Sequence, residues 1–362
     1  MIKGLLFDVD GVIFNSEPFI RQAYTRAFAD LGAEIKDEDF APIVGTGEIT
    51  SINYLAEISD LKVDAVEVKK AIYDYYGQVI KGKLKAFAGV VEFIHACSSA
   101  GVKLALATSS DRVKLLKSMK ETGLDINLFD AVICGDEVSR TKPFPDIYTY
   151  AAAKLVLPPE ETLVVEDALN GLSAAHYAGC HAMGVATSFD EKALLLGGAD
   201  FVVKSFEEFG AFSSVEELNS LITKKTDSAI SNSFIGELIR KASSALEHAY
   251  APYSHFRVGA AVLTSRSGVY SACNFENASY GATRCAEQGA VHAAVSAEGP
   301  EVEIKAVAVA SETEDPAPPC AICRQVLNEF SGPDTQVYLY SVKTGKVLHY
   351  SFRQLLPLAF EL

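Results

Sequence analysis

Two short stretches in the last third of the chain decide the fold of that part: Thr283-Arg284-Cys285-Ala286-Glu287-Gln288 and Pro319-Cys320-Ala321-Ile322-Cys323. The C-x-x-C spacing of the second lets two sulfurs reach one ion from a single helical turn. Pro319 suits a first helical position and residues 286–297 are rich in helix formers, so both stretches are expected to begin helices. Helix N-termini offer free N–H groups and partial positive charge, which would stabilise thiolates placed there.

The three cysteines of these stretches predict a zinc site with one open position. Three protein ligands leave the fourth position for water, which is the catalytic pattern, whereas four cysteines would close the metal off. Glu287 lies two residues after Cys285, which reproduces the C-x-E and P-C-x-x-C signature of zinc deaminases. The alternative is accidental spacing of three reduced cysteines.

Length and composition predict two or three packed domains. The chain has 362 residues, 49% of them hydrophobic, and no apolar run of membrane-spanning length. Met1 leads directly into an apolar segment, so we expect a cytoplasmic protein. The net charge of −15 argues against a broad nucleic-acid-binding surface. Four further cysteines are expected to be reduced core residues: Cys97, Cys134, Cys180 and Cys273.

The first part of the chain alternates apolar strands with helical segments. Strands are expected at 2–9, 103–107, 131–135 and 162–165, and a helix at 16–31. This alternation predicts an α/β fold with a parallel, doubly wound sheet. Polar motifs follow the strands: Asp8-Val9-Asp10-Gly11, Thr108-Ser109-Ser110, Lys142-Pro143 and Glu166-Asp167. In such a sheet the carboxyl ends of the strands meet at the edge where ligands bind.

This set of motifs resembles the haloacid dehalogenase superfamily over residues 1–210, in particular the β-phosphoglucomutase-like phosphatases with a helical cap. The resemblance implies a cap at about 15–88, Mg²⁺ as cofactor and a small phosphate ester as substrate. It implies that Asp8 is the nucleophile, Asp10 the general acid/base and Lys142 the residue that offsets phosphoryl charge. The implied magnesium residues are Asp8, Asp10, Glu166 and Asp167, and the implied phosphoryl contacts are Thr108, Ser109 and Lys142.

The chemistry of these residues agrees with that resemblance. A carboxylate can attack an anionic phosphate ester only if cations mask the charge, and Mg²⁺ prefers oxygen ligands. An aspartyl phosphate would split one hard step into two. Taken alone, the D-x-D-G motif is also compatible with a solvated strand end. The loop Gly45-Thr46-Gly47-Glu48 is either a leaving-group contact or a surface turn. No histidine lies in residues 18–24, which favours a hydrolase over a mutase.

A polar stretch predicts the division of the chain. We expect a first domain at 1–222, which ends in a helix at 215–222, a linker at 223–231, and a second domain at 232–362. The second domain would begin with a helix at 234–248 and continue through a loop into a strand over 250–263. Further strands are expected at 304–310 and 336–340, which together predict a mixed α/β/α sandwich.

Residues 233–362 resemble a short, tetrameric cytidine deaminase. The resemblance implies zinc on Cys285, Cys320 and Cys323, with Glu287 as the proton shuttle. Implied substrate contacts are Asn274 and Glu276 to the ribose, Phe256 beside the pyrimidine, Ala286, and Phe360 from a neighbouring subunit. It therefore implies a homotetramer. Gln288 stands where three-cysteine members usually carry Arg, and an amide offsets thiolate charge less than a guanidinium does.

The combined prediction is a bifunctional enzyme that deaminates cytidine or deoxycytidine and hydrolyses a small phosphate ester, with a nucleoside monophosphate as one candidate for that ester. Its expected partners are small molecules, with neither nucleic acid nor membrane. Three alternatives stay open at this point: a polynucleotide cytosine deaminase, a deaminase with an inert scaffold hydrolase, and a deaminase of a blasticidin-type nucleoside antibiotic.

Overall fold

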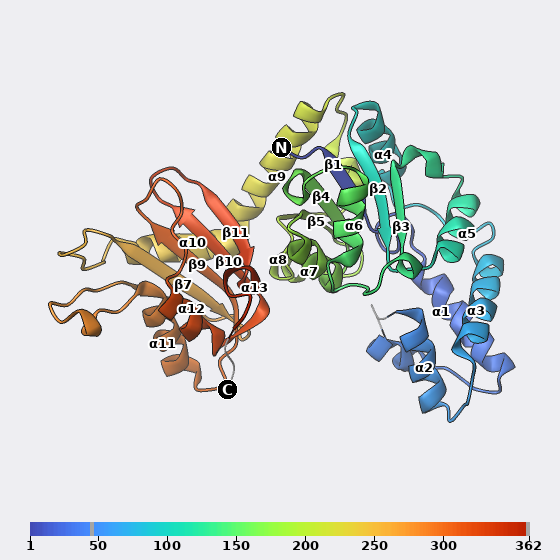
Figure 1. Cartoon of the computed structure of the whole chain (residues 1–362), viewed down its shortest axis with the longest axis horizontal. Helices are drawn as coiled ribbons and strands as arrows, with labels where there is room; N and C mark the ends of the chain where they lie inside the picture. Colours follow the sequence, from blue (N-terminus) through green and yellow to red (C-terminus); the bar gives the residue numbers. More distant parts are fainter. Residues whose placement is uncertain (44–46, 360–362) are drawn as a thin grey trace. The chain divides into compact units, whose positions relative to one another are not determined.

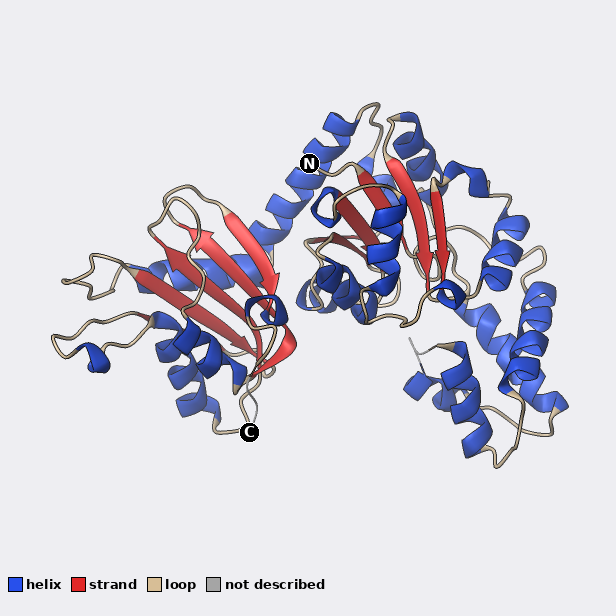
Figure 2. Ribbon diagram, in the orientation of Figure 1, coloured by secondary structure: helices blue, strands red, loops and turns tan. Residues whose placement is uncertain are grey.

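The computed structural model describes residues 1–43 and 47–359, which form two compact units with one sheet each (Figure 1 and Figure 2). The first unit takes residues 1–194 and 201–223, and the second takes 195–200 and the chain from 224 onward. Helix α9 (Val215–Asn232) runs across this division. The helix expected at 215–222 therefore continues through residues 223–231, which are helical.

The sheet of the first unit has six parallel strands in the order β3-β2-β1-β4-β5-β6. Their bounds are β1 (Gly4–Phe7), β2 (Lys103–Thr108), β3 (Ala131–Cys134), β4 (Thr162–Glu166), β5 (His181–Val185) and β6 (Phe201–Val203). Most of their residues are buried, as expected where helices cover both faces of a parallel sheet. The strand order reverses between β1 and β4, which is where ligands bind in doubly wound sheets. The predicted fold class is confirmed, and β5 and β6 add two strands that were not predicted.

Three helices between β1 and the rest of this unit gather at one end of it, away from the sheet (Figure 1): α1 (Glu17–Asp30), α2 (Glu48–Ile58) and α3 (Ala65–Val79). Helix α1 buries Ile20, Ala23, Tyr24, Ala27 and Phe28, a three-and-four spacing that gives it one apolar face. The side chain of Asp64 caps α3 by accepting from the N–H groups of Val66 and Glu67. These helices form the cap.

The remaining helices of this unit follow the strands in alternation. They are α4 (Val90–Ser99), α5 (Arg112–Thr122), α6 (Asp146–Lys154), α7 (Leu169–Ala178) and α8 (Glu191–Leu196). Short 3₁₀ turns lie at Asp37–Ile43, Ile126–Leu128, Gly135–Glu137, Pro159–Glu161 and Phe206–Phe209. Parallel neighbouring strands need such crossover connections, and helices supply them here.

The second unit holds a mixed five-stranded sheet in the order β11-β10-β9-β7-β8. Strands β9 and β10 are parallel, and the other neighbours are antiparallel. The strands are β7 (Val258–Thr264), β8 (Val269–Cys273), β9 (Ile304–Ser311), β10 (Ser331–Ser341) and β11 (Val347–Ser351). The helices are α10 (Phe234–Leu246), α11 (Ala286–Glu298), α12 (Ala321–Asn328) and α13 (Phe352–Leu355), and a 3₁₀ turn lies at Tyr280–Ala282.

The core of this unit lies between the sheet and helix α11. Ala286, Ala290 and Ala294 of α11 pack against alternate residues of three strands, among them Val262, Val307 and Val337. Small residues on α11 let the helix approach the sheet closely, which fixes the height of its first turn above the strands. Helix α10 lies on the other face (Figure 1), which agrees with the predicted sandwich. Within the described residues, no helix is long and apolar enough to cross a membrane.

Candidate active sites

The predicted acids of the first unit meet where β1 and β4 end. Asp8 follows β1, Glu166 closes β4 and Asp167 follows it, and all three side chains are buried. One oxygen from each can be chosen so that the three lie within 4.8 Å of one another. Lys142 is also buried here, and its Nζ donates to Asp8 Oδ1 at 2.6 Å and to Glu166 Oε1 at 2.7 Å. The structure therefore brings these four predicted residues together.

Glu166 is held on both oxygens. Its Oε1 also accepts from the hydroxyl of Tyr148 at 2.8 Å, and its Oε2 accepts from the backbone N–H groups of Asp167 and Ala168. A Cβ at Gly171 would lie 1.7 Å from Glu166 Oε1, so the glycine makes room for the carboxylate. Glu166 thereby fixes the position of Lys142.

The glycine of the D-x-D-G motif also has a physical reason. Gly11 has a φ of +81°, which favours glycine, and a Cβ there would lie 1.9 Å from Asp167 Oδ2. The chain thus passes close over the Asp167 carboxylate. Asp167 accepts a short hydrogen bond from the hydroxyl of Ser188, which the sequence reading did not single out.

The buried carboxylates need more positive charge than Lys142 supplies. Burial raises the pKa of Asp8 to about 7, although Lys142 acts in the opposite direction. Burial and the Glu166 carboxylate raise the pKa of Asp167 well above its usual range. A divalent cation would keep both groups ionised, and an all-oxygen donor set is the kind that Mg²⁺ prefers. The residues present therefore fit a magnesium ion.

Asp10 stands apart from that cluster. Its Oδ2 accepts from Lys114 Nζ at 2.9 Å and from Ser110 Oγ at 2.7 Å, and Oδ1 accepts a short bond from Ser16 Oγ. Burial alone would raise its pKa, but Lys114 and the Ser16 hydroxyl lower it. The group of acids close enough to share an ion contains Asp8, Glu166 and Asp167 and lacks Asp10. Asp10 therefore lies outside the group of acids that could share the ion, and its carboxylate is held by Lys114, Ser110 and Ser16.

A cavity of about 630 Å³ opens from these acids towards the cap. Thr108 and Ser109 line it on the core side, as expected for phosphoryl contacts, and the Thr108 hydroxyl accepts from Ser110 N–H at 3.0 Å. On the cap side Glu48, the first residue of α2, lines the cavity. Gly45 and Thr46 of the predicted loop lie outside the described residues.

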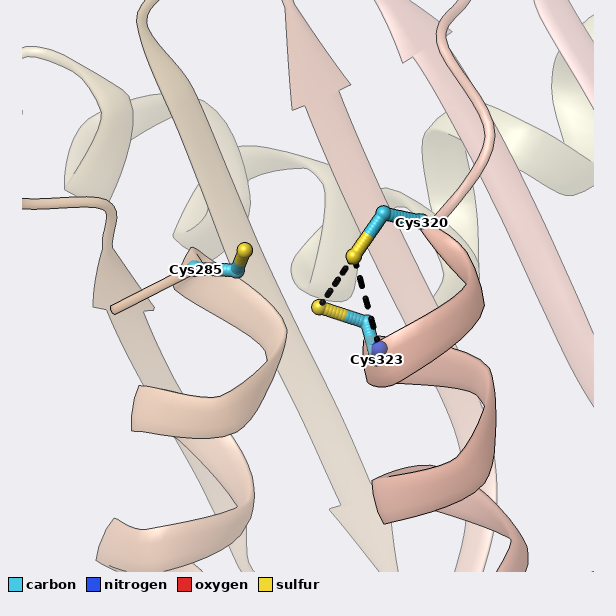
Figure 3. Close-up of side chains that lie close together, drawn as sticks. All are labelled: Cys285, Cys320 and Cys323. Carbon is cyan, nitrogen blue, oxygen red and sulfur yellow. Dashed lines mark hydrogen bonds between the residues drawn. The ribbon is translucent and has the colours of Figure 1, made fainter. Parts of the chain in front are cut away.

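The three predicted thiols of the second unit converge from two helix starts (Figure 3). Cys285 is the N-cap of α11 and Cys320 the N-cap of α12, and the three Sγ atoms lie within 4.8 Å of one another. Cys320 Sγ lies 3.4 Å from Cys323 Sγ and accepts from the Cys323 N–H at 3.5 Å. Zinc–sulfur bonds of about 2.3 Å in a tetrahedron require sulfurs a little under 4 Å apart. The thiols therefore fit a zinc ion.

Gln288 lies against this site. Its Nε2 points at Cys323 Sγ from 3.7 Å, so the amide contributes a weak hydrogen bond to one thiol. The two nearby arginines donate to backbone carbonyls instead of sulfur. Arg324 donates to the carbonyls of Pro319 and Leu355, and Arg284 to those of Gly281 and Thr283. Of these three side chains, Gln288 is therefore the one whose hydrogen bond reaches a thiol.

Glu287 and Ala286 form the buried first turn of α11. Ala286 is fully buried and Glu287 is 4% exposed. Burial raises the pKa of Glu287, while backbone and Cys323 hydrogen bonds act against that rise. A raised pKa makes a carboxyl a better proton acceptor, which is what a group that shuttles protons requires.

The predicted ribose-binding pair is engaged in holding a loop. Asn274 donates from Nδ2 to the Phe256 carbonyl at 2.9 Å and accepts the Val258 N–H on Oδ1 at 2.9 Å. Glu276 accepts from the N–H groups of Tyr253 and Ser254 and from the Ser254 hydroxyl. Phe256 is 41% exposed, and Phe360 lies outside the described residues. The pair therefore fixes the loop that carries Phe256.

Each of the two units matches a known protein family in sequence. Residues 5–185 match the haloacid dehalogenase-like hydrolase family, and residues 233–340 match the cytidine and deoxycytidylate deaminase zinc-binding region. A phosphorylated carbohydrates phosphatase from Thermotoga maritima is 33% identical over 57% of this chain and 96% of its own length. A cytidine deaminase from Halalkalibacterium halodurans is 46% identical over 34% of this chain and 91% of its own length.

A solved structure and a longer relative complete the comparison. CbbY from Rhodobacter sphaeroides in complex with phosphate matches with a TM-score of 0.55 and 28% identity, over 60% of this chain and 100% of that one. The Arabidopsis thaliana protein SUPPRESSOR OF QUENCHING 1, chloroplastic, is 33% identical over 63% of this chain. The chain spans only 21% of the length of that relative.

Proposed function

Because residues 5–185 belong to the haloacid dehalogenase-like hydrolases and the part from residue 233 belongs to the cytidine deaminases, we propose that the chain is a bifunctional hydrolase. One activity is the hydrolytic deamination of cytidine or deoxycytidine to uridine or deoxyuridine. The other is the Mg²⁺-dependent hydrolysis of a small phosphate ester. We assign the first domain to residues 1–222, the connection to 223–231 and the deaminase to 232–362.

The deaminase proposal rests on three thiols within 4.8 Å of one another beside a buried carboxylate, Glu287. Zinc held by Cys285, Cys320 and Cys323 supplies, when bound, a water whose pKa is lowered towards neutrality. Glu287 takes one proton from the attacking water and gives it to N3 of the cytosine ring as the water oxygen bonds to C4. It then takes the second proton from that oxygen and gives it to the 4-amino group, which leaves as ammonia when the C4–N bond breaks. Burial raises the pKa of Glu287, which favours its holding each proton in transit.

The nucleoside would be held beside these groups. Phe256 offers its exposed ring to the pyrimidine face, and Asn274 and Glu276 fix the Phe256 loop. When the ribose binds, its hydroxyls would exchange with some of the loop hydrogen bonds of Asn274 and Glu276. The backbone at Ala286 lies in the same first turn of α11 as Glu287, at the base of this site.

The phosphatase proposal rests on the cluster of Asp8, Glu166, Asp167 and Lys142. Asp8 attacks phosphorus and forms an aspartyl phosphate, while Asp10 gives a proton to the leaving alcohol. Asp10 then accepts a proton from the water that splits the aspartyl phosphate. Lys142 offsets the charge of the transferring group, and the hydroxyls of Thr108 and Ser109 receive its oxygens. Mg²⁺, when bound, supplies the remaining positive charge.

A single preparation of the full chain tests both activities. We expect loss of cytidine with zinc present, and release of inorganic phosphate from p-nitrophenyl phosphate that requires added Mg²⁺. Deamination without any phosphate release would favour the alternative in which the hydrolase domain is an inert scaffold. Turnover of a cytosine in single-stranded DNA in preference to cytidine would contradict the nucleoside assignment.

The linkage of the domains in one chain suggests that the phosphatase substrate is a pyrimidine nucleotide whose product feeds the deaminase. CMP would then give cytidine and, in turn, uridine. We expect kcat/KM for CMP to equal or exceed that for ribose 5-phosphate, measured on the Glu287→Gln variant so that deamination does not interfere. Nucleotide values more than about a hundredfold below the sugar phosphate would contradict this order of reactions, since that is a difference of about 2.7 kcal/mol.

We also propose that the deaminase domain assembles as a homotetramer. Around the Phe256 loop the described surface exposes five aromatic side chains, each at least 41% accessible: Tyr250, Tyr253, Phe256, Phe275 and Tyr280. Exposed aromatics gathered in one loop region are characteristic of surfaces that another chain covers. A second subunit would also bring its own C-terminal residues to this face.

The tetramer proposal predicts an effect for a residue near the chain's end. Phe360→Ala should lower kcat/KM for cytidine about tenfold, since one lost aromatic contact is worth about 1.4 kcal/mol. Light scattering coupled to gel filtration should give a tetramer for both proteins. Phe212→Ala, in the other unit, serves only as a stability comparison, because its ring is buried there. An active monomer would refute the proposal.

We further propose that the protein works in a reducing compartment such as the cytoplasm. All seven cysteines are free thiols. Three of them must stay reduced to serve as zinc ligands, because thiolates and not disulfides bind the metal. Reducing conditions of this kind are typical of the cytosol.

A further inference from the structure

The cap side of the phosphatase cavity differs in charge from its core side. Among the described residues, six carboxylates and three cations line the cavity. Two of the cations are already bound by core carboxylates: Lys142 by Asp8 and Glu166, and Lys114 by Asp10. A magnesium ion at the core acids would serve one phosphoryl group there. The cap residues therefore determine the charge around the end of the substrate that lies farthest from the phosphoryl group.

The cap contributes one cation to the cavity, and its charge is offset. Arg21 donates from Nε to Glu17 Oε1 at 2.9 Å, one helical turn earlier in α1. Its guanidinium also lies 5.3 Å from the centre of the Phe40 ring. An arginine that is paired with a carboxylate and stacked on a ring is a poor receptor for a second anion.

Glu48 adds a negative charge to the cap side of the cavity. It is the first residue of α2 and lines the cavity with Tyr24 and Ser51. Among the described residues no lysine or arginine forms an ion pair with it. Burial raises the pKa of Glu48, and the Lys114 ammonium, which forms its ion pair with Asp10, opposes that rise from a distance. The neighbouring residues 44–46, Val-Gly-Thr, bring no charge by their sequence.

We propose that Glu48 restricts the phosphatase to monophosphate esters whose leaving group is uncharged and offers hydroxyl or amino donors. The Glu48 carboxylate would accept hydrogen bonds from such a leaving group. The hydroxyl oxygens of Tyr24 and Ser51, which line the same cavity, can accept hydrogen bonds as well. A second phosphate or a carboxylate at that end would meet Glu48 at short range in a partly buried site, where like charges repel strongly. This inference rests on the proposed phosphatase function and adds its substrate class.

Fructose 1-phosphate and fructose 1,6-bisphosphate form a matched pair of probes, because the second differs by one phosphate at the far end. With the full chain and Mg²⁺, we expect the monophosphate to be favoured at least about tenfold in kcat/KM, or in Ki against p-nitrophenyl phosphate where turnover is slow. Glu48→Gln should reduce this preference to less than about threefold, mainly by improving the bisphosphate. Glu57→Gln removes the same charge from an exposed position on α2 and should leave the preference unchanged.

The outcomes separate the two claims. Hydrolysis of p-nitrophenyl phosphate with no preference between the two fructose esters would overturn the role of Glu48 and leave the phosphatase standing. So would a preference that Glu48→Gln and Glu57→Gln change equally. If p-nitrophenyl phosphate itself is not hydrolysed, the phosphatase function fails and this inference falls with it.

Discussion

Replacing Glu287 with Gln is expected to abolish cytidine deamination and to leave the zinc bound. Gln keeps the shape of the side chain in the buried first turn of α11, but an amide cannot carry protons at neutral pH. General acid–base catalysis contributes about 10²–10⁴-fold, and Glu287 serves at least two proton transfers, so we expect a loss at the upper end of that range. Zinc content and the initial rate of cytidine consumption should be measured on the same preparation.

The zinc measurement separates a proton-transfer role from a structural one. The group that could hold the ion is made of the three thiols and does not include Glu287, so metal content should match that of the unmodified protein. Glu301→Gln, at an exposed position in the same domain, is a matched control that should keep full activity. Turnover within about tenfold of the unmodified protein would rule out Glu287 as the proton shuttle. Loss of zinc together with activity would instead assign it to holding the metal.

The sequence could predict the zinc site because its geometry is local. Cys320 and Cys323 are three residues apart at the start of one helix, and Cys285 directly precedes another. Helix starts are marked by residues next to them in the chain, such as Pro319, so the spacing of the motif already implies a common face. What the sequence could not supply was which neighbour meets the thiols. The structure places Gln288, and not Arg284 or Arg324, against sulfur.

The partners of Asp10 were missed for the opposite reason. Lys114 and Ser110 lie about a hundred residues from it in the chain. Lys114 belongs to no motif, and the motif that contains Ser110 indicated phosphoryl contacts and not a hydrogen bond to Asp10. A buried lysine in the first turn of α5 looks like any surface lysine of an amphipathic helix until the fold brings it to Asp10. Long-range contacts of this kind depend on packing and leave no local pattern.

Strand boundaries show the same limit. The predicted strand at 2–9 is four residues in the structure, Gly4–Phe7, because Asp8 to Asp10 leave the sheet to form the site. Strand β6 has three residues, too few for any alternation to be read. The polar stretch at 223–231 has the composition of a linker but continues α9, since Thr, Lys, Asp and Ser on exposed positions do not prevent a helix that has already begun.

Asp8→Asn is expected to abolish phosphate release and to leave deamination unchanged. An amide is too weak a nucleophile to attack phosphorus, so hydrolysis of p-nitrophenyl phosphate should fall below about one part in 10³ of the normal rate. Asn can still accept the hydrogen bond from Lys142 Nζ, and it removes a buried carboxylate whose burial is unfavourable, so the variant should fold. Both activities should be measured on one preparation.

Magnesium binding gives a readout that does not depend on turnover. In the unmodified protein, Mg²⁺ should raise the Tm at which the first domain unfolds, because a ligand that binds the folded state stabilises it. The Asp8→Asn variant should show a smaller rise in Tm. Asp37→Asn, at an exposed position of the cap, should keep both the shift and the activity. Phosphate release that survives in Asp8→Asn would remove Asp8 as nucleophile. If deamination collapses in a variant that still folds, the two sites are coupled and the picture of two independent modules is wrong.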